Sequence, residues 1–170
     1  MAPTTPYSHL LGDRDPIDAL RQTPEQIRRI AASWSPADFE RRYAPGKWTA
    51  GQVLTHLAQT EIALGTRARM ALTTPDYTAQ NFDQDEWMVR ESRLTGADAL
   101  GAFVAVSRMN LALFESLAPS DRAVSLSHPE YGALTIDWIV YQMAGHQIHH
   151  LKQLATIRPS PSALSPSPQP

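Results

Sequence analysis

Apolar residues recur every three or four positions in four long stretches of the chain, a spacing that places them on one face of an α-helix. Helix-start patterns open two of these stretches, with Thr49 followed by Gln52 and Thr95 followed by Asp98. Four amphipathic helices with little strand signal predict an all-α fold, a four-helix bundle. We expect the long helices to cover residues 15–34, 49–72, 95–117 and 135–157.

The first helix has two candidate starts in the sequence. It could begin at Asp15, which precedes Pro16, or again at Thr23, which precedes Pro24. Both places combine a capping residue with a proline suited to the first helical position. A separate short helix is expected to follow at Ser35, where the same capping pattern recurs.

The segments between and beyond the helices differ in character. Residues 123–134 alternate weakly and carry turn residues, so they could form a small hairpin or an irregular loop. The connection over residues 73–93 is long for a bundle, and such loops tend to be functional or to cover a site. We therefore divide the chain into a loose N-terminal segment (1–14), a single helical-bundle domain (15–158) and a disordered Pro/Ser-rich tail (159–170).

Composition narrows the chemistry that this chain can carry. Its 170 residues are enough for one domain with a real core, and its formal net charge of -2 gives no reason to expect nucleic acid. Without cysteine there are no disulfides, thiolate ligands or cysteine nucleophiles, so any metal must be held by His, Asp or Glu. The first residues lack the apolar run of a secretion signal and no segment approaches about 18 uninterrupted apolar residues, so we expect a cytoplasmic protein.

Two histidines four residues apart, His146 and His150, lie within the apolar stripe of the last helix. Residues at this spacing share one face of a helix, so both rings point toward the core. A buried imidazole without a partner costs free energy, and two stacked imidazoles can together bind one metal ion. His149 falls on the flank of the stripe and is expected to be a neighbour of the site. Alternatively, the rings only form hydrogen bonds in the core.

The second helix adds a third histidine and a glutamate in unusual positions. His56 lies at the edge of the apolar face, where it can reach inward, and three imidazoles leave one position open for water or substrate. Glu61 lies well inside that face, where a carboxylate needs a partner. It could orient a ligand imidazole, act as a general base or join the metal, or it could pair with Arg67 or Arg69. His9 and His128 are expected to be bystanders.

The order of these motifs resembles the DinB/YfiT-like superfamily. The run over residues 43–61, with Pro-Gly-Lys-Trp followed by His-Leu and then Glu61, is similar to the PGKW-to-HLxxxE signature of that family. The run over residues 145–154 is similar to its closing HxxHHxxQ helix, and residues 83–87 and 128–132 look like segments of the YfiT branch. The resemblance covers about residues 24 to 157. One departure is Glu61, where YfiT-like members often have histidine.

The resemblance implies a four-helix bundle in which His56, His146 and His150 hold a divalent metal ion, zinc or nickel. Some members are S-transferases or isomerases that use low-molecular-weight thiols, many are named as metal-dependent hydrolases, and many look dimeric. We therefore expect a metal-dependent thiol S-transferase acting on small electrophiles, with Glu61 as a catalytic residue, a small-molecule substrate and a homodimeric state. The alternatives are a hydrolase of a small molecule and a non-catalytic, stress-response metal-binding bundle.

Overall fold

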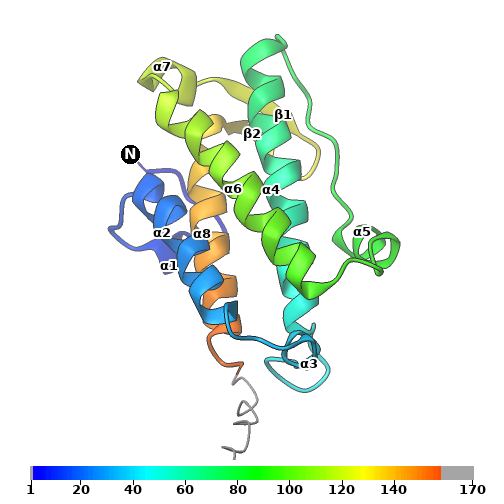
Figure 1. The fold of residues 1–170 in the computed structure, drawn as a ribbon. Helices are drawn as coiled ribbons and strands as arrows, with labels where there is room; N and C mark the ends of the chain where they lie inside the picture. Colours follow the sequence, from blue (N-terminus) through cyan, green and yellow to red (C-terminus); the bar gives the residue numbers. More distant parts are fainter. Residues whose placement is uncertain (1, 158–170) are drawn as a thin grey trace, which may run out of the picture.

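A computed structural model describes residues 2–157, and four long helices form its body (Figure 1). α4 packs against α6 and α8, and α2 packs against α8 and α6, which closes the bundle. The predicted all-α, four-helix fold is confirmed. The long helices are α2 (Pro16–Ala31), α4 (Ala50–Thr73), α6 (Gly96–Ser116) and α8 (Ile136–Leu154). The shorter elements are α1 (Ser8–Leu11), α3 (Pro36–Phe39), α5 (Gln84–Arg90), α7 (Pro119–Arg122), β1 (Ser125–His128) and β2 (Gly132–Thr135).

The backbone N–H groups in the first turn of a helix have no backbone acceptor, and the long helices start where a side chain can accept a hydrogen bond from one of them. The side chain of Thr49 accepts a hydrogen bond from the backbone N–H of Gln52, and Thr95 and Thr135 cap α6 and α8 in the same way. Asp15 caps α2, which continues through Pro24 to Ala31. The second candidate start at Thr23 is therefore wrong, because Thr23 is a buried residue inside one continuous helix. The predicted end of this helix at residue 34 is also three residues too far.

A buried polar layer crosses the middle of the bundle and divides the core into two apolar clusters. On α4 the apolar cluster that includes Leu54 and Leu57 ends at Ala58, and the other begins at Leu64. Buried polar side chains fill the gap on every long helix, and this layer contains the predicted site. Its members are Thr23 on α2, Gln59, Thr60 and Glu61 on α4, Ser107 and Asn110 on α6, and His146, Gln147 and His150 on α8, and His56 of α4 joins them from beside the apolar run that ends at Ala58.

The segments whose structure the sequence left open form small ordered elements at the ends and side of the bundle. Residues 123–134 contribute to an antiparallel hairpin, in which Leu126 pairs with Leu134 and His128 with Gly132. Gly132 has a φ of 70°, a left-handed conformation that suits glycine in a tight turn. In the long connection, Thr78 pairs with Ser127 of β1, and α5 follows before α6 begins. The connection therefore lies against the hairpin.

The N-terminal segment is packed, which corrects the prediction that residues 1–14 are loose. Leu11 is buried, and the indole N–H of Trp138 donates a hydrogen bond to the backbone oxygen of Thr4 at 3.0 Å. The short helix α1 lies against α8. The prediction failed because these contacts are made with a helix more than 120 residues further along the chain. The predicted disordered tail over residues 159–170 lies outside the described residues.

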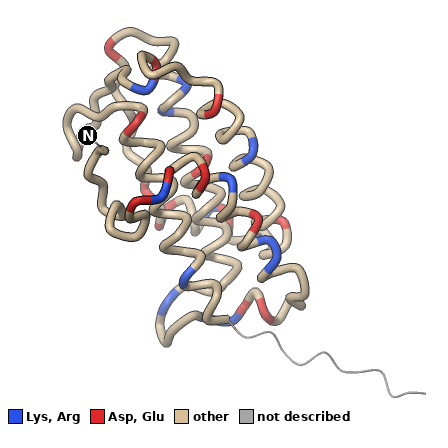
Figure 2. The backbone as a smooth tube through the Cα atoms, turned by 90° about the vertical axis from the view of Figure 1, so that its left-hand side faces the viewer, with Lys and Arg blue, Asp and Glu red and all other residues tan. Residues whose placement is uncertain are grey.

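Basic and acidic residues are mixed along the bundle, as Figure 2 shows. Within residues 2–157, α6 alone is long and apolar enough to cross a membrane by length and composition. Core helices of soluble proteins pass the same test, and α6 packs against both α2 and α4.

Candidate metal centre

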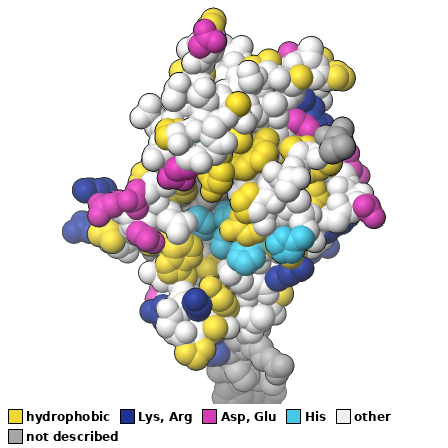
Figure 3. All heavy atoms as spheres, turned by 180° about the vertical axis from the view of Figure 1, so that it is seen from behind, with side chains coloured by type: hydrophobic (Ala, Val, Ile, Leu, Met, Phe, Trp, Pro, Cys, Tyr) yellow, Lys and Arg dark blue, Asp and Glu magenta, His cyan; other side chains and the backbone are white. Residues whose placement is uncertain are grey.

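The structure brings together the three histidines that the sequence selected. Nε2 of His146 lies 3.0 Å from Nε2 of His56 and 3.0 Å from Nε2 of His150. One nitrogen from each ring lies within 4.8 Å of the others, and all three residues are 5% exposed. In Figure 3, histidine side chains gather at a hollow rimmed by hydrophobic side chains. Two helices, α4 and α8, therefore present three nitrogens to one point.

Burial keeps these imidazoles neutral, the form in which they bind metals. The pKa of His56 falls to about 4 and that of His150 to about 3, and the pKa of His146 lies well below its usual value. Loss of solvation is the largest cause for each ring, and the neighbouring histidines act in the same direction. At neutral pH the cluster is a set of uncharged nitrogen donors.

Gln153 fixes the protonation pattern of one member of the cluster. Nδ1 of His150 donates a hydrogen bond to Oε1 of Gln153 at 2.7 Å, so its Nε2 carries a lone pair. The amide Nε2 of Gln153 lies 3.0 Å from Nε2 of His149, to which it donates. Such an outer partner orients a ligand ring and raises its basicity. His149 is thus a neighbour of the cluster, as its flanking position predicted.

The cluster fits a divalent metal ion better than it fits internal hydrogen bonding. A neutral ring at position 146 has at most one proton on Nε2 to share with two neighbours, and Nε2 of His150 has none to give. Nδ1 of His56 is buried and has no partner among the described residues. A metal ion accepts all three lone pairs at once. Three imidazoles suit zinc, nickel, copper or iron, and leave positions free for a further ligand.

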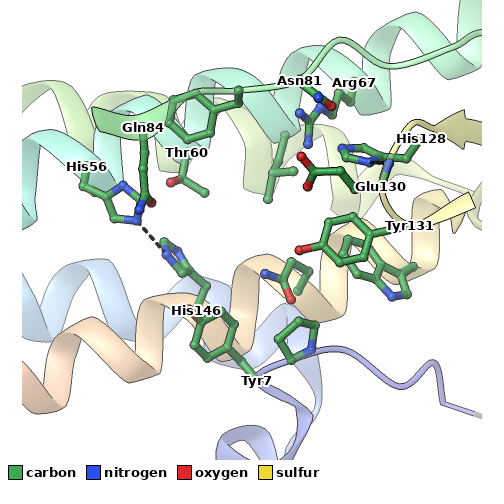
Figure 4. Close-up of a pocket in the computed structure, with 15 residues that line it drawn as sticks. Tyr7, His56, Thr60, Arg67, Asn81, Gln84, His128, Glu130, Tyr131 and His146 are labelled. Carbon is green, nitrogen blue, oxygen red and sulfur yellow. Dashed lines mark hydrogen bonds between the residues drawn. The ribbon is translucent and has the colours of Figure 1, made fainter. Parts of the chain in front are cut away.

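A cavity of about 250 Å³ adjoins the cluster, with His56 and His146 in its wall (Figure 4). Tyr7 from the N-terminal segment also lines the cavity, and its ring centre lies 5.3 Å from that of His146. The ring of Phe82, from the long connection, stacks over His56 with centres 6.4 Å apart. The two segments that the sequence treated as loose or as a loop therefore help to enclose the site.

Glu61 lies in the same polar layer but faces away from the cavity. Its Oε1 accepts a hydrogen bond from Nε2 of Gln147 at 2.7 Å, and its Oε2 accepts one from Nδ2 of Asn110 at 2.8 Å. Arg69 donates to Oδ1 of the same Asn110 at 2.7 Å. This arginine, one of the two predicted partners of Glu61, is therefore linked to the carboxylate only through the side chain of Asn110. Within the described residues, Glu61 forms no hydrogen bond with the three histidines. Its catalytic role stays a prediction.

Glu61 is expected to make the stability of the fold depend on pH. Burial raises its pKa from 4.5 to about 7, and this outweighs the two amide donors. Between these pH values the folded chain holds a proton that the unfolded chain releases, so the group's contribution to stability falls as pH rises. The full effect is about 3 kcal/mol. Glu61→Gln removes this titrating group. As the pH is raised from 5 to 8, the free energy of unfolding of the variant should therefore increase relative to that of the wild type.

The measurement is urea unfolding of both proteins, stripped of metal, at several pH values. Titration of the histidines affects both proteins equally and cancels in the difference. A change of hydrogen bonding on substitution adds only a constant offset. A difference in unfolding free energy that stays flat across this pH range would contradict a raised pKa.

Three residues that contribute to the site escaped the sequence analysis or were given a different role. Gln153 is the final residue of the HxxHHxxQ motif, but the sequence analysis gave it no role, although its place three residues after His150 and four after His149 puts it beside both on a helix. Tyr7 gave no local signal, because its place depends on packing against α8. His128 was expected to be a bystander, but it lines the same cavity.

These features define a class of protein: a helical bundle whose central polar layer holds a three-histidine candidate metal centre beside a cavity. The sequence model of the DinB superfamily matches residues 19–154, and the chain belongs to this superfamily. A protein of Oceanobacillus iheyensis named "Putative metal-dependent hydrolase" is 24% identical over 142 residues, covering 83% of each chain. A Bacillus mycoides protein with the same description is 22% identical over 143 residues, covering 84% of this chain and 83% of the relative.

Two solved structures have a similar fold. YfiT from Bacillus subtilis, described as a probable metal-dependent hydrolase with an unusual four-helix bundle topology, matches with a TM-score of 0.76 and 19% identity. That match covers 84% of this chain and 83% of YfiT. A mycothiol-dependent maleylpyruvate isomerase matches with a TM-score of 0.70 and 14% identity, covering 88% of this chain and 63% of the isomerase. At these identities the similarity shows a shared fold.

Proposed function

We propose that the protein is a metal-dependent enzyme that transfers a low-molecular-weight thiol to a small electrophile. The observation that carries this proposal is the convergence of three buried, neutral imidazole nitrogens, within 4.8 Å of one another, beside a cavity. The names of the sequence relatives support metal-dependent chemistry, and the name of the mycothiol-dependent isomerase supports thiol chemistry in this fold. Zinc and nickel are the two metals proposed.

Each residue of the cluster has a definable task. His56, His146 and His150 would hold the ion, and a divalent ion bound by three imidazoles lowers the pKa of a thiol or water molecule at its free position. Gln153 keeps the proton of His150 on Nδ1 and so keeps Nε2 available. Tyr7 and Phe82 border the rings and reduce the access of bulk water to them.

Hydrolysis of a small molecule is the second candidate, favoured by the names of the relatives. A hydrolase needs a base that takes a proton from the attacking water within the cavity. Glu61 was the sequence-based candidate for this base, but it faces Asn110 and Gln147 instead. A metal-bound thiol ionises more readily than metal-bound water and so depends less on such a base, and in this respect the position of Glu61 favours the transferase. Glu130, the carboxylate that does line the cavity, lies at the end away from the three-histidine cluster.

Metal content tests the first step of the proposal. Wild-type protein purified from cells grown with zinc and nickel should contain about one equivalent of metal by mass spectrometry, because three nitrogens form one site. His150→Ala should lose most of it. His149→Ala is the matched control, since it removes an adjacent imidazole that lies outside the cluster, and it should keep its metal. Wild-type protein that stays empty after incubation with both ions would refute the metal centre.

Turnover assays separate the two reactions. The metal-loaded protein is mixed with a model electrophile and a panel of thiols, and separately with simple esters and amides. We expect consumption of the electrophile that depends on both thiol and metal. Turnover that needs metal but no thiol would overturn the transferase in favour of the hydrolase. Metal binding without any turnover would favour the non-catalytic bundle, whose metal would be structural.

We also propose that the protein acts as a homodimer in the cytoplasm. This rests on the resemblance to the superfamily and on apolar side chains left exposed on the helices. On α4, Ile62 and Met70 are 45% and 38% exposed, and on α6 Met109 is 57% exposed. Exposed apolar side chains mark protein–protein contacts where they form a contiguous patch.

A further inference from the structure

The cavity has a second, polar end that the proposed chemistry does not use. Its wall at this end includes Arg67 of α4, Asn81 of the long connection, and His128, Glu130 and Tyr131 of the β-hairpin. Figure 4 shows these residues grouped together, apart from His56 and His146 at the other end. A substrate that fills the cavity therefore meets both the histidines and this group.

Arg67 faces the same cavity as His56 because of its position on α4. Eleven residues separate the two, which is close to three full turns, so they share one face about 16 Å apart along the helix axis. Side chains on a helix lean toward its N-terminus, so the Arg67 guanidinium extends back toward His56. Arginine is also the longer of the two side chains, so its guanidinium can lie closer to the His56 ring than this axial distance.

The guanidinium of Arg67 is half-buried and has no carboxylate partner. Its Nη2 donates to the backbone oxygen of Gln80 at 2.6 Å, the one hydrogen bond of this side chain found within residues 2–157. Glu130 is near enough to affect it electrostatically, but no acidic group in the described chain lies within the 4.0 Å of an ion pair. Arginine carries five N–H donors, so most of them remain free for a ligand.

His128 supplies a second donor at this end. The backbone N–H of Glu130 donates to Nδ1 of His128 at 3.2 Å. A neutral imidazole that accepts at Nδ1 carries its proton on Nε2, and burial keeps this ring neutral by lowering its pKa. With the amide of Asn81 and the hydroxyl of Tyr131, hydrogen-bond donors outnumber the single carboxylate of Glu130.

We propose that this end of the cavity is an anion subsite that binds a carboxylate of the substrate or thiol, with Arg67 as its main contact. The planar guanidinium matches the two oxygens of a carboxylate. The reacting atom of the same molecule would lie at the histidines, and in this respect the inference rests on the proposed function. The negative charge of Glu130 repels anions. A carboxylate therefore gains affinity at this end of the cavity only when it contacts Arg67 directly.

A set of thiols of graded length tests the subsite. The zinc-loaded full chain is titrated calorimetrically with ω-mercaptoalkanoic acids of three, six and eight carbons and with the ω-mercaptoalcohols of the same lengths. Both series offer the same thiol, so their affinity ratio isolates the carboxylate. We expect equal affinities for the short pair and about tenfold tighter binding of the acid for a longer pair, the effect of one charge-assisted contact.

Three variants assign this preference to residues. Arg67→Gln should abolish it, while Arg29→Gln, which removes the same charge from an exposed position outside the cavity, should leave it intact. Glu130→Gln should strengthen binding of the acids, because it removes a repulsive charge. Acids and alcohols that bind alike at every length, or a preference that survives Arg67→Gln, would overturn the subsite.

Failure of the proposed function gives a different result from failure of the subsite. If no thiol binds, the thiol chemistry is wrong, and the same titration is repeated with hexanoate and hexanol. The resonance of the Arg67 Nε–H group, followed by NMR, should then move with hexanoate alone. No movement with hexanoate would overturn the anion subsite independently of the metal.

Discussion

Stripped of metal, the protein is expected to lose stability steeply as the pH falls from 6.5 toward 4. The three buried imidazoles are neutral in the folded chain, with pKa values of about 4 for His56, about 3 for His150 and well below normal for His146. In the unfolded chain each titrates near 6.5. Within this range the unfolded chain therefore binds up to three protons that the folded chain does not bind.

The size of this effect follows from proton linkage. Each additional proton bound by the unfolded chain changes the free energy of unfolding by about 1.4 kcal/mol per pH unit, so the three histidines give a slope of about 4. Glu61, which keeps in the folded chain a proton that the unfolded chain holds only below about pH 4.5, acts in the opposite direction and lowers the net slope to about 3. The contribution of the histidines is fully present above pH 6.5 and is lost as the pH falls through the lowered pKa values. Because small domains are stabilised by only about 5–15 kcal/mol, the metal-free protein should unfold before pH 4.

Chemical unfolding of the metal-free protein at half-unit pH intervals measures this slope. His146→Gln should reduce it by about 1.4 kcal/mol per pH unit, since one of three titrating rings is removed. His9→Gln, a substitution outside the cluster, should leave it unchanged. If the free energy of unfolding changes between pH 6.5 and 4.5 by less than the slope expected for one proton, the burial of three neutral rings would be contradicted.

Replacing Gly65 with alanine is expected to be the most disruptive single-methyl change in the bundle core. A Cβ at this position would lie 2.3 Å from Oδ1 and 2.7 Å from Nδ2 of Asn110. Asn110 cannot simply rotate away, because it donates to Glu61 and accepts from Arg69. Its displacement would leave buried polar groups unsatisfied, which costs roughly 3–5 kcal/mol for the network.

Thermal or urea unfolding of Gly65→Ala measures the loss. Gly101→Ala is its control, because this glycine also lies inside a long helix but a Cβ there meets nothing within 4 Å. The control should gain up to about 1 kcal/mol, since alanine favours helix. Equal stabilities of the two variants would show that Asn110 is not held in this network.

The sequence predicted the candidate metal centre because the spacing of residues along a helix shows which side chains share a face. His146 and His150 lie one turn apart, and His56 lies at the edge of an apolar face, so periodicity alone directs all three inward. Glu61 was recognised as an inward carboxylate for the same reason. Periodicity does not say which neighbour an inward residue meets, so Glu61 was assigned to the site although it contacts Asn110 and Gln147.

The rest of the site depends on contacts between distant segments, which local patterns do not encode. Tyr7 reaches His146 because α8 has a glycine at position 145, where a Cβ would lie 2.7 Å from the backbone oxygen of Tyr7. His128 lines the cavity because the hairpin, whose strand β2 packs against α8, brings it there. The predicted helix start at Thr23 is wrong for a related reason. A threonine followed by a proline can begin a helix, but here both residues are buried in the interior of α2.

The ordered N-terminal segment has a practical consequence for anyone who works with this protein. The family match begins at residue 19, and the sequence pattern suggests a domain that starts at residue 15. A gene trimmed to either boundary would encode all three histidines of the cluster and all of the bundle except, for the later boundary, the first turn of α2. It would nevertheless lack Pro6 and Tyr7, which form part of the cavity wall. Such a product could bind metal normally and still give misleading substrate preferences, so screening should use the untrimmed N-terminus.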